Sequence, residues 1–68
     1  MNYSAKYLIK LLENNGYSYH RTKGSHLLFY HPGKNKTVIV PVHGNKDLPK
    51  GTFYAILKQA ELDTSVLF

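Results

Sequence analysis

The spacing of apolar side chains changes at Gly16 from a helical period to a two-residue alternation, and this change limits the folds open to the chain. Before Gly16, apolar residues recur at i, i+3, i+4 and i+7, which places them on one face of a helix: Ala5, Leu8, Ile9 and Leu12. Ser4 is a suitable N-cap, since its hydroxyl can accept a hydrogen bond from the first turn. Asn14-Asn15-Gly16 can end the helix, because glycine adopts the left-handed conformation readily. We therefore expect one amphipathic helix before Gly16.

The segment after Gly16 predicts three short strands. Aromatic and polar side chains alternate, or β-branched residues follow one another, over Tyr17–Thr22, His26–Tyr30 and Thr37–Val40. The connections are short and carry turn residues, with glycine in Lys23–Ser25 and Pro-Gly in His31–Gly33. Strands joined so closely form an antiparallel meander.

A second helix is expected after the polar loop that follows the strands. Its apolar residues again show the helical spacing: Phe53, Ile56, Leu57 and Ala60. The helix could begin with Pro49 in the first turn or with Thr52 as its cap. The last residues, 63–68, have no clear period. Their apolar end, Val66–Phe68, is either folded back on the core or covered by a partner.

The order helix, three strands, helix predicts an α+β fold in which both helices cover one face of the sheet. Because side chains alternate along a strand, each residue can be assigned to a face. The residues expected to face the helices are Leu27, Phe29, Val38 and Val40. Those expected on the open face are His26, Leu28, Tyr30 and Ile39. The apolar members of the open set are either scattered exposed residues or part of a surface that a protein covers.

Length and composition predict one small cytoplasmic domain spanning residues 1–68, with a core of about 3–62 and a short tail. The chain has 68 residues and no cysteine, so disulfides and thiolate metal sites are excluded. Its apolar fraction of 43% argues against disorder. No apolar run approaches the roughly 20 residues that span a bilayer, and no signal peptide is visible.

Positive charge is concentrated in the middle of the chain. Seven of the nine Lys and Arg residues lie between Asn14 and Ala60, where Asp47 is the only acid. Such an imbalance favours binding to a polyanion such as nucleic acid. A lysine-rich solubilising surface would give the same count.

Few catalytic arrangements are compatible with the sequence. The four histidines have neither the spacing nor the cysteine partners of a zinc site, paired carboxylates are absent, and no glycine-rich loop joins a strand to a helix. One arrangement remains, Lys23-Gly24-Ser25-His26, which sets an imidazole beside a cation and a small turn. Imidazole exchanges protons near neutral pH, and RNA carries a 2′-hydroxyl that attacks its own phosphate once deprotonated. The other interpretation of His26 is an ordinary surface residue of a strand.

Several separated motifs resemble the HicA toxin family, in order and over residues 3 to 62. They are Arg21-x-Lys23-Gly24-Ser25-His26, Phe29-x-His31-Pro32, Val38-x-Val40-Pro41, Lys46-Asp47-Leu48-Pro49-Lys50-Gly51-Thr52 and Ile56-Leu57-Lys58-Gln59-Ala60. The resemblance implies a double-stranded-RNA-binding-domain-like fold of order α-β-β-β-α. It also implies a metal-independent endoribonuclease that cleaves mRNA, needs no cofactor and is inhibited by a HicB antitoxin. The catalytic histidine of the family corresponds to His26.

The resemblance and the charge pattern together assign roles to further residues. Arg21 and Lys23 would stabilise phosphate charge, and the turn at Gly24 and Ser25 would let RNA approach or would simply form the hairpin. Two loop lysines, Lys46 and Lys50, would hold neighbouring phosphates or belong to a solvated loop. An antitoxin that competes with RNA would cover His26 and contact the apolar part of the open face: Leu28, Tyr30 and Ile39.

Two positions depart from the family pattern. Leu27 stands where many members have a second histidine, so any help from that imidazole would be lost. Glu61 stands where many have glycine, so the last helix could run further. The alternatives to an enzyme are a non-catalytic module that binds double-stranded RNA through its helices, and a protein whose open face serves only a partner.

Overall fold

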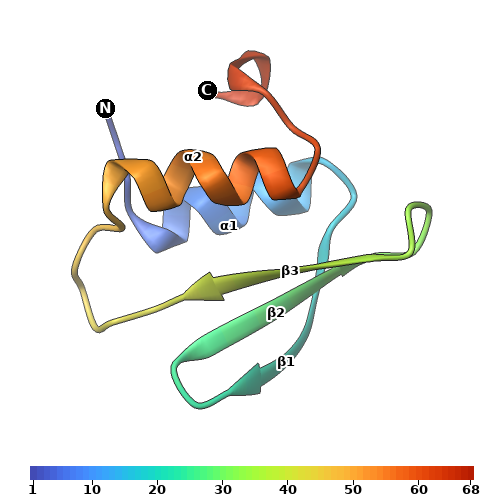
Figure 1. Cartoon of the computed structure of the whole chain (residues 1–68), viewed down its shortest axis with the longest axis horizontal. Helices are drawn as coiled ribbons and strands as arrows, with labels where there is room; N and C mark the ends of the chain where they lie inside the picture. The colour runs from blue at the N-terminus through green and yellow to red at the C-terminus, as the bar shows by residue number, and fades with distance from the viewer.

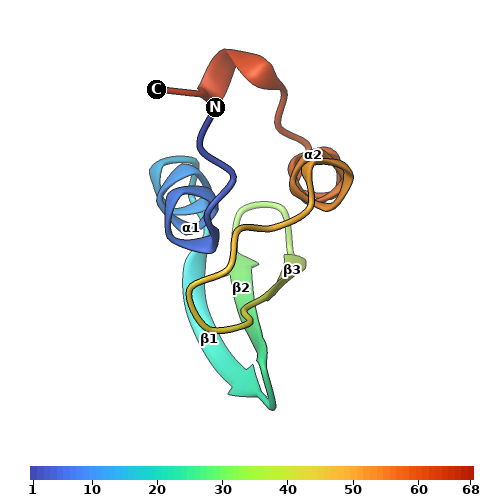
Figure 2. The same ribbon diagram turned by 90° about the vertical axis from the view of Figure 1, so that its left-hand side faces the viewer.

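The computed structural model describes all 68 residues and has the element order α-β-β-β-α. The elements are α1 (Ala5–Asn14), β1 (Ser18–Lys23), β2 (His26–His31), β3 (Lys36–Pro41), α2 (Lys50–Gln59) and a short 3-10 turn, η1 (Thr64–Val66). The three strands form one antiparallel sheet in the order β1-β2-β3. Both helices lie side by side on one face of it (Figures 1 and 2). The expected α+β, double-stranded-RNA-binding-domain-like fold is confirmed.

Helix α1 begins as predicted, with the Ser4 hydroxyl accepting a hydrogen bond from the Tyr7 N–H at 3.1 Å. Its buried face is turned slightly from the predicted one. The fully buried side chains include Leu11, which the i, i+3, i+4 pattern left out, whereas Ala5 and Ile9 pack only at the edge of the core. The face is wider than the pattern indicated because the helix contacts both the sheet and α2.

The inner face of the sheet forms the core together with the helices. Phe29, Val38 and Val40 are buried, and Leu27 is half-buried against the same cluster. Cross-strand pairing sets Phe29 opposite Val38 and Leu27 opposite Val40. Since paired side chains point to the same face, the residues between them point outward. Ile39 is accordingly 45% exposed, and the predicted division of the two faces is confirmed for β2 and β3.

Strand β1 departs from strict alternation. Tyr19 pairs with Phe29 and Arg21 pairs with Leu28, so one extra residue, His20, is accommodated as a β-bulge. The strand runs over Ser18–Lys23 rather than Tyr17–Thr22. Tyr17 precedes the strand and is buried. The bulge puts Tyr19 and Arg21 on opposite faces of the sheet, whereas strict alternation would put both on one face.

Helix α2 begins at Lys50 with Pro49 at the capping position, so Thr52 is not the cap. Its end corrects the expectation drawn from Glu61. The helix stops at Gln59, and Glu61 takes the left-handed conformation, with φ +61°. The Leu62 N–H donates to the Leu57 carbonyl at 2.9 Å, which completes the usual C-terminal motif with Glu61 in the position that glycine favours.

The C-terminal tail folds back on the helical side of the molecule. The Tyr7 hydroxyl donates to the Phe68 carbonyl at 2.8 Å and accepts from the Phe68 N–H at 2.9 Å. Val66 and Leu67 pack against the core. Figure 2 shows the tail on the side of the helices that faces away from the sheet. Of the two alternatives for the apolar end, the chain adopts the folded-back one.

Tyr17 joins the ends of the two helices. Its ring is buried, and its hydroxyl donates to the Ala60 carbonyl at 2.9 Å. Burial raises the pKa of the Tyr17 phenol above its usual value, and the negative charge of Glu61 raises it further. The folded protein therefore holds this proton more tightly than the unfolded chain does.

Replacing Tyr17 with phenylalanine should lower the free energy of unfolding by about 1–2 kcal/mol at neutral pH, because the buried Ala60 carbonyl loses its donor. The stabilisation from the phenol proton is fully present below about pH 10 and is lost as the pH rises above it. Urea unfolding followed by circular dichroism between pH 7 and 11 should show a steeper alkaline loss for the parent than for Tyr17→Phe. Equal alkaline slopes would show that folding does not tighten the hold of Tyr17 on its proton.

Gly16 should tolerate a side chain less well than other left-handed glycines. Its φ is +93°, and an added Cβ would clash with Nε2 of His31. Gly44 is the matched control, since its φ is +60° and an added Cβ meets nothing within 4 Å. We expect Gly44→Ala to cost about 1 kcal/mol from the backbone alone and Gly16→Ala to cost clearly more. Thermal unfolding of both variants measures the difference, and equal losses would refute the steric argument.

Candidate active site

The hairpin formed by β1 and β2 projects away from the helices, as Figures 1 and 2 show. Every residue of β1 is exposed. At its tip Lys23 pairs with His26 across the two-residue turn Gly24-Ser25. Gly24 has φ +61°, which suits the first position of a tight hairpin turn. The turn therefore holds the Lys23 and His26 side chains next to each other on the outer face.

An open depression of about 630 Å³ lies on the outer face of the sheet at this tip. Five of the predicted site residues line it together with two of the predicted apolar contacts: Arg21, Lys23, Gly24, Ser25, His26, Leu28 and Ile39. Arg21 is drawn onto this face by the bulge, because it pairs with the outward-facing Leu28. The depression thus brings residues of all three strands together.

His26 occupies the first position of the central strand, between Lys23 on β1 and Pro41 on β3. Its side chain is exposed. None of the side-chain hydrogen bonds within the chain involves its ring. Both ring nitrogens are therefore open to a bound molecule.

The cations beside His26 have no acidic partner. Both ion pairs of the protein belong to Glu61, which lies 3.4 Å from Nζ of Lys34 and 3.7 Å from Nζ of Lys36. Arg21 and Lys23 consequently keep their full charge toward solvent. A basic group beside two cations without acidic partners is suited to removing a proton while a negative charge develops nearby.

Tyr30 lies further along the outer face, outside the depression. Its hydroxyl donates to Oδ1 of Asn35 at 2.7 Å. The Tyr30 side chain is half-buried. Leu28 and Ile39, unlike Tyr30, line the depression itself. The predicted apolar contact surface is therefore continuous with the His26 site but extends past it.

The structure does not bring Lys46 and Lys50 into the depression. Lys46 belongs to the β3–α2 loop and lines a separate hollow of about 540 Å³ with His43 and Thr52, and Lys50 is the first residue of α2. Both side chains are exposed. This loop lies at the same end of the molecule as the hairpin turn (Figure 1).

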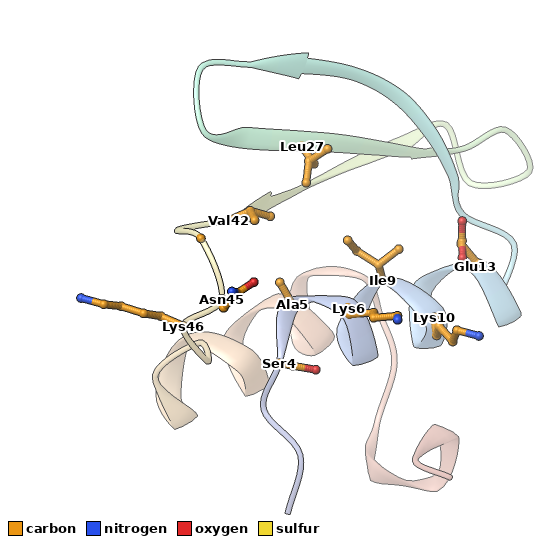
Figure 3. Close-up of a pocket in the computed structure, with 11 residues that line it drawn as sticks. Ser4, Ala5, Lys6, Ile9, Lys10, Glu13, Leu27, Val42, Asn45 and Lys46 are labelled. Carbon is orange, nitrogen blue, oxygen red and sulfur yellow. The ribbon is translucent and has the colours of Figure 1, made fainter.

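Leu27, the departure beside His26, points away from the site. It lines a hollow of about 480 Å³ between the hairpin and α1, where Figure 3 shows it directed toward the helix near Val42 and Ile9. Successive residues of a strand face opposite sides, so a side chain at position 27 cannot share the depression with His26. The absence of a second histidine there leaves the outer face unchanged.

His20 was not among the predicted site residues. Its ring centroid lies 6.5 Å from that of Tyr30, which places it over the outer face. Strict alternation would set His20 and Arg21 on opposite faces, and no feature of the sequence marks the bulge that brings both to the outer one. No three His, Asp or Glu side chains converge as a metal site would require.

No helix of the protein is long and apolar enough to cross a membrane.

Comparison with protein families shows to which family the chain belongs. Comparison with curated proteins gave no match. The family model described as the HicA toxin of bacterial toxin–antitoxin systems matches residues 5–62, which include both helices, the whole sheet and the His26 depression. The chain therefore belongs to the HicA toxin family.

Proposed function

We propose that the protein is an endoribonuclease toxin that cleaves mRNA, with His26 as the general base. The observation that supports this most strongly is an exposed imidazole without an internal hydrogen bond, which lines the same depression as Arg21 and Lys23, two cations that have no acidic partner. Membership of a toxin family supplies the biological role. The positive charge of the face favours a polyanionic substrate.

The reaction uses a nucleophile that RNA itself carries. His26 takes the proton of a 2′-hydroxyl, and the 2′ oxygen bonds to the adjacent phosphorus. The bond from phosphorus to the 5′ oxygen breaks, and that oxygen takes a proton from solvent. Arg21 and Lys23 stabilise the charge that develops on the phosphate oxygens. The products carry a 2′,3′-cyclic phosphate and a 5′-hydroxyl.

Residues around the depression serve binding and inhibition in this proposal. The small turn at Gly24 and Ser25 lets the phosphate approach His26, and Lys46 and Lys50 hold phosphates further along the strand. A HicB-type antitoxin inhibits the toxin by covering His26 and packing against Leu28, Tyr30 and Ile39, with acidic groups facing the cations. The exposure of Ile39 supports this surface.

Replacing His26 with alanine should slow RNA cleavage by about 100- to 10,000-fold, the usual contribution of a general base. Cleavage of a labelled mRNA under single-turnover conditions measures the effect. The fold should be preserved, because the side chain is exposed and makes no hydrogen bond in the chain. Circular dichroism and thermal unfolding check this.

His43→Ala is the matched control for that variant. His43 is also exposed, but it lies in the β3–α2 loop outside the depression, so its removal should leave the cleavage rate near that of the parent. Full activity of His26→Ala would reject the proposed base. If RNA binding rather than turnover falls in His26→Ala, the protein is a binding module and not an enzyme.

The attacking group can be tested separately on the substrate. An RNA with a single 2′-deoxynucleotide at the cleavage position should resist cleavage there, because no 2′-hydroxyl is available to attack. Cleavage of the all-ribose RNA should persist in EDTA and give 2′,3′-cyclic phosphate ends, which mass spectrometry identifies. Products with 5′-phosphate ends would indicate attack by water instead.

A further inference from the structure

A pair of aromatic rings lies on the outer face beyond the His26 depression. The centroids of His20 and Tyr30 are 6.5 Å apart and their planes are inclined by 49°. His20 is exposed and Tyr30 half-buried, so both offer ring surface to solvent. Neither residue lines the depression. The pair is therefore a feature of its own.

Alternation along the first half of β1 sets this pair, and the bulge adds a cation to it. Because Tyr19 pairs with the inward-facing Phe29, with 6.0 Å between their ring centroids, the next residue, His20, faces outward and lies over Tyr30. Strict alternation would turn Arg21 inward again, but the extra residue between Tyr19 and Arg21 brings Arg21 to the outer face as well. The Tyr30 ring is held in place by the hydrogen bond from its hydroxyl to Asn35. The outer face thus carries one fixed ring and one exposed ring beside a free cation, Arg21.

Rings of this kind on an open sheet face, with cations alongside, are suited to stacking with nucleobases. We propose that His20 and Tyr30 form a stacking subsite for one base of single-stranded RNA. The subsite rests on the proposed function, and Arg21 holds the phosphate between the stacked base and His26.

The position of the pair indicates which nucleotide it holds. Tyr30 is four residues beyond His26 on β2, a distance of about 13 Å along the strand. The stacked base therefore belongs to a neighbouring nucleotide and not to the cleaved one. Bases inside a duplex stack on each other and do not present their faces to a protein, so the subsite selects single strands or loops.

The test measures binding of a short single-stranded RNA to the His26→Ala protein, so that cleavage does not interfere. Adding His20→Ala and Tyr30→Ala should weaken binding about 5- to 100-fold, the effect expected for one stacked base. Replacing one base of the RNA with an abasic residue should cause a similar loss at a single position. That abasic loss should disappear in the variant that lacks both rings.

Three controls separate stacking from other causes. Tyr19→Ala removes an exposed ring from the same strand but from the opposite face, and should leave binding unchanged. His20→Phe and Tyr30→Phe keep the ring faces and should bind like the parent. A duplex of the same sequence should bind equally with or without the two rings.

The proposal fails if the variant lacking both rings binds single-stranded RNA as the parent does, or if Tyr19→Ala weakens binding equally. It also fails if binding of RNA is normal and only binding of a partner protein is lost, since the rings would then serve that partner. Cleavage assays of the unmodified protein report separately on the proposed function. A ribonuclease that cleaves normally without the two rings would keep its function and lose this subsite.

Discussion

One-sided burial of the sheet is the constraint on which the site depends. The helices cover the face that carries Phe29, Val38 and Val40, and these side chains fix the register of β2 and β3. A slip by one residue would expose this apolar set to solvent, so the register is strongly held. His26 is three residues before Phe29 and therefore faces outward. The packing of the core thus sets the direction of an imidazole that contacts none of it.

The residue that follows α2 decides which cations of the chain have an acidic partner. Gly16 ends α1 and Glu61 follows α2 in the same left-handed conformation. Glycine at position 61 would adopt this conformation at less cost, but it would leave Lys34 and Lys36 without their acidic partner. With Glu61 present, the charge at the β2–β3 end is partly neutralised and the hairpin end keeps Arg21 and Lys23 free. The two uses that we propose for this face, by RNA and by an antitoxin, depend on that asymmetry.

Sequence patterns predicted the fold well because each element has a strong local period. The alternation of apolar residues in β2 and β3 placed His26, Leu28 and Ile39 correctly on the open face.

The sequence pattern failed where tertiary packing overrides the local signal. It missed the bulge at His20, because an extra residue in a strand leaves no mark in the order of polar and apolar types. It also allowed α2 to continue through Glu61, since a glutamate gives no stop signal, whereas the packing of Leu62 and the bond of its N–H to Leu57 end the helix. The motif Lys23-Gly24-Ser25-His26 located the depression, but the distance of Lys46 and Lys50 from it depends on the course of a loop.

We propose that RNA lies on the outer face of the sheet and not along the helices. The most direct test of this placement is an NMR titration of the ¹⁵N-labelled protein with a 2′-deoxy-substituted RNA that cannot be cleaved. We expect amide shift changes concentrated at Arg21, Lys23, His26 and Leu28, with little change in α1. Changes concentrated in α1 and the start of α2, with the hairpin unaffected, would contradict this placement of the RNA.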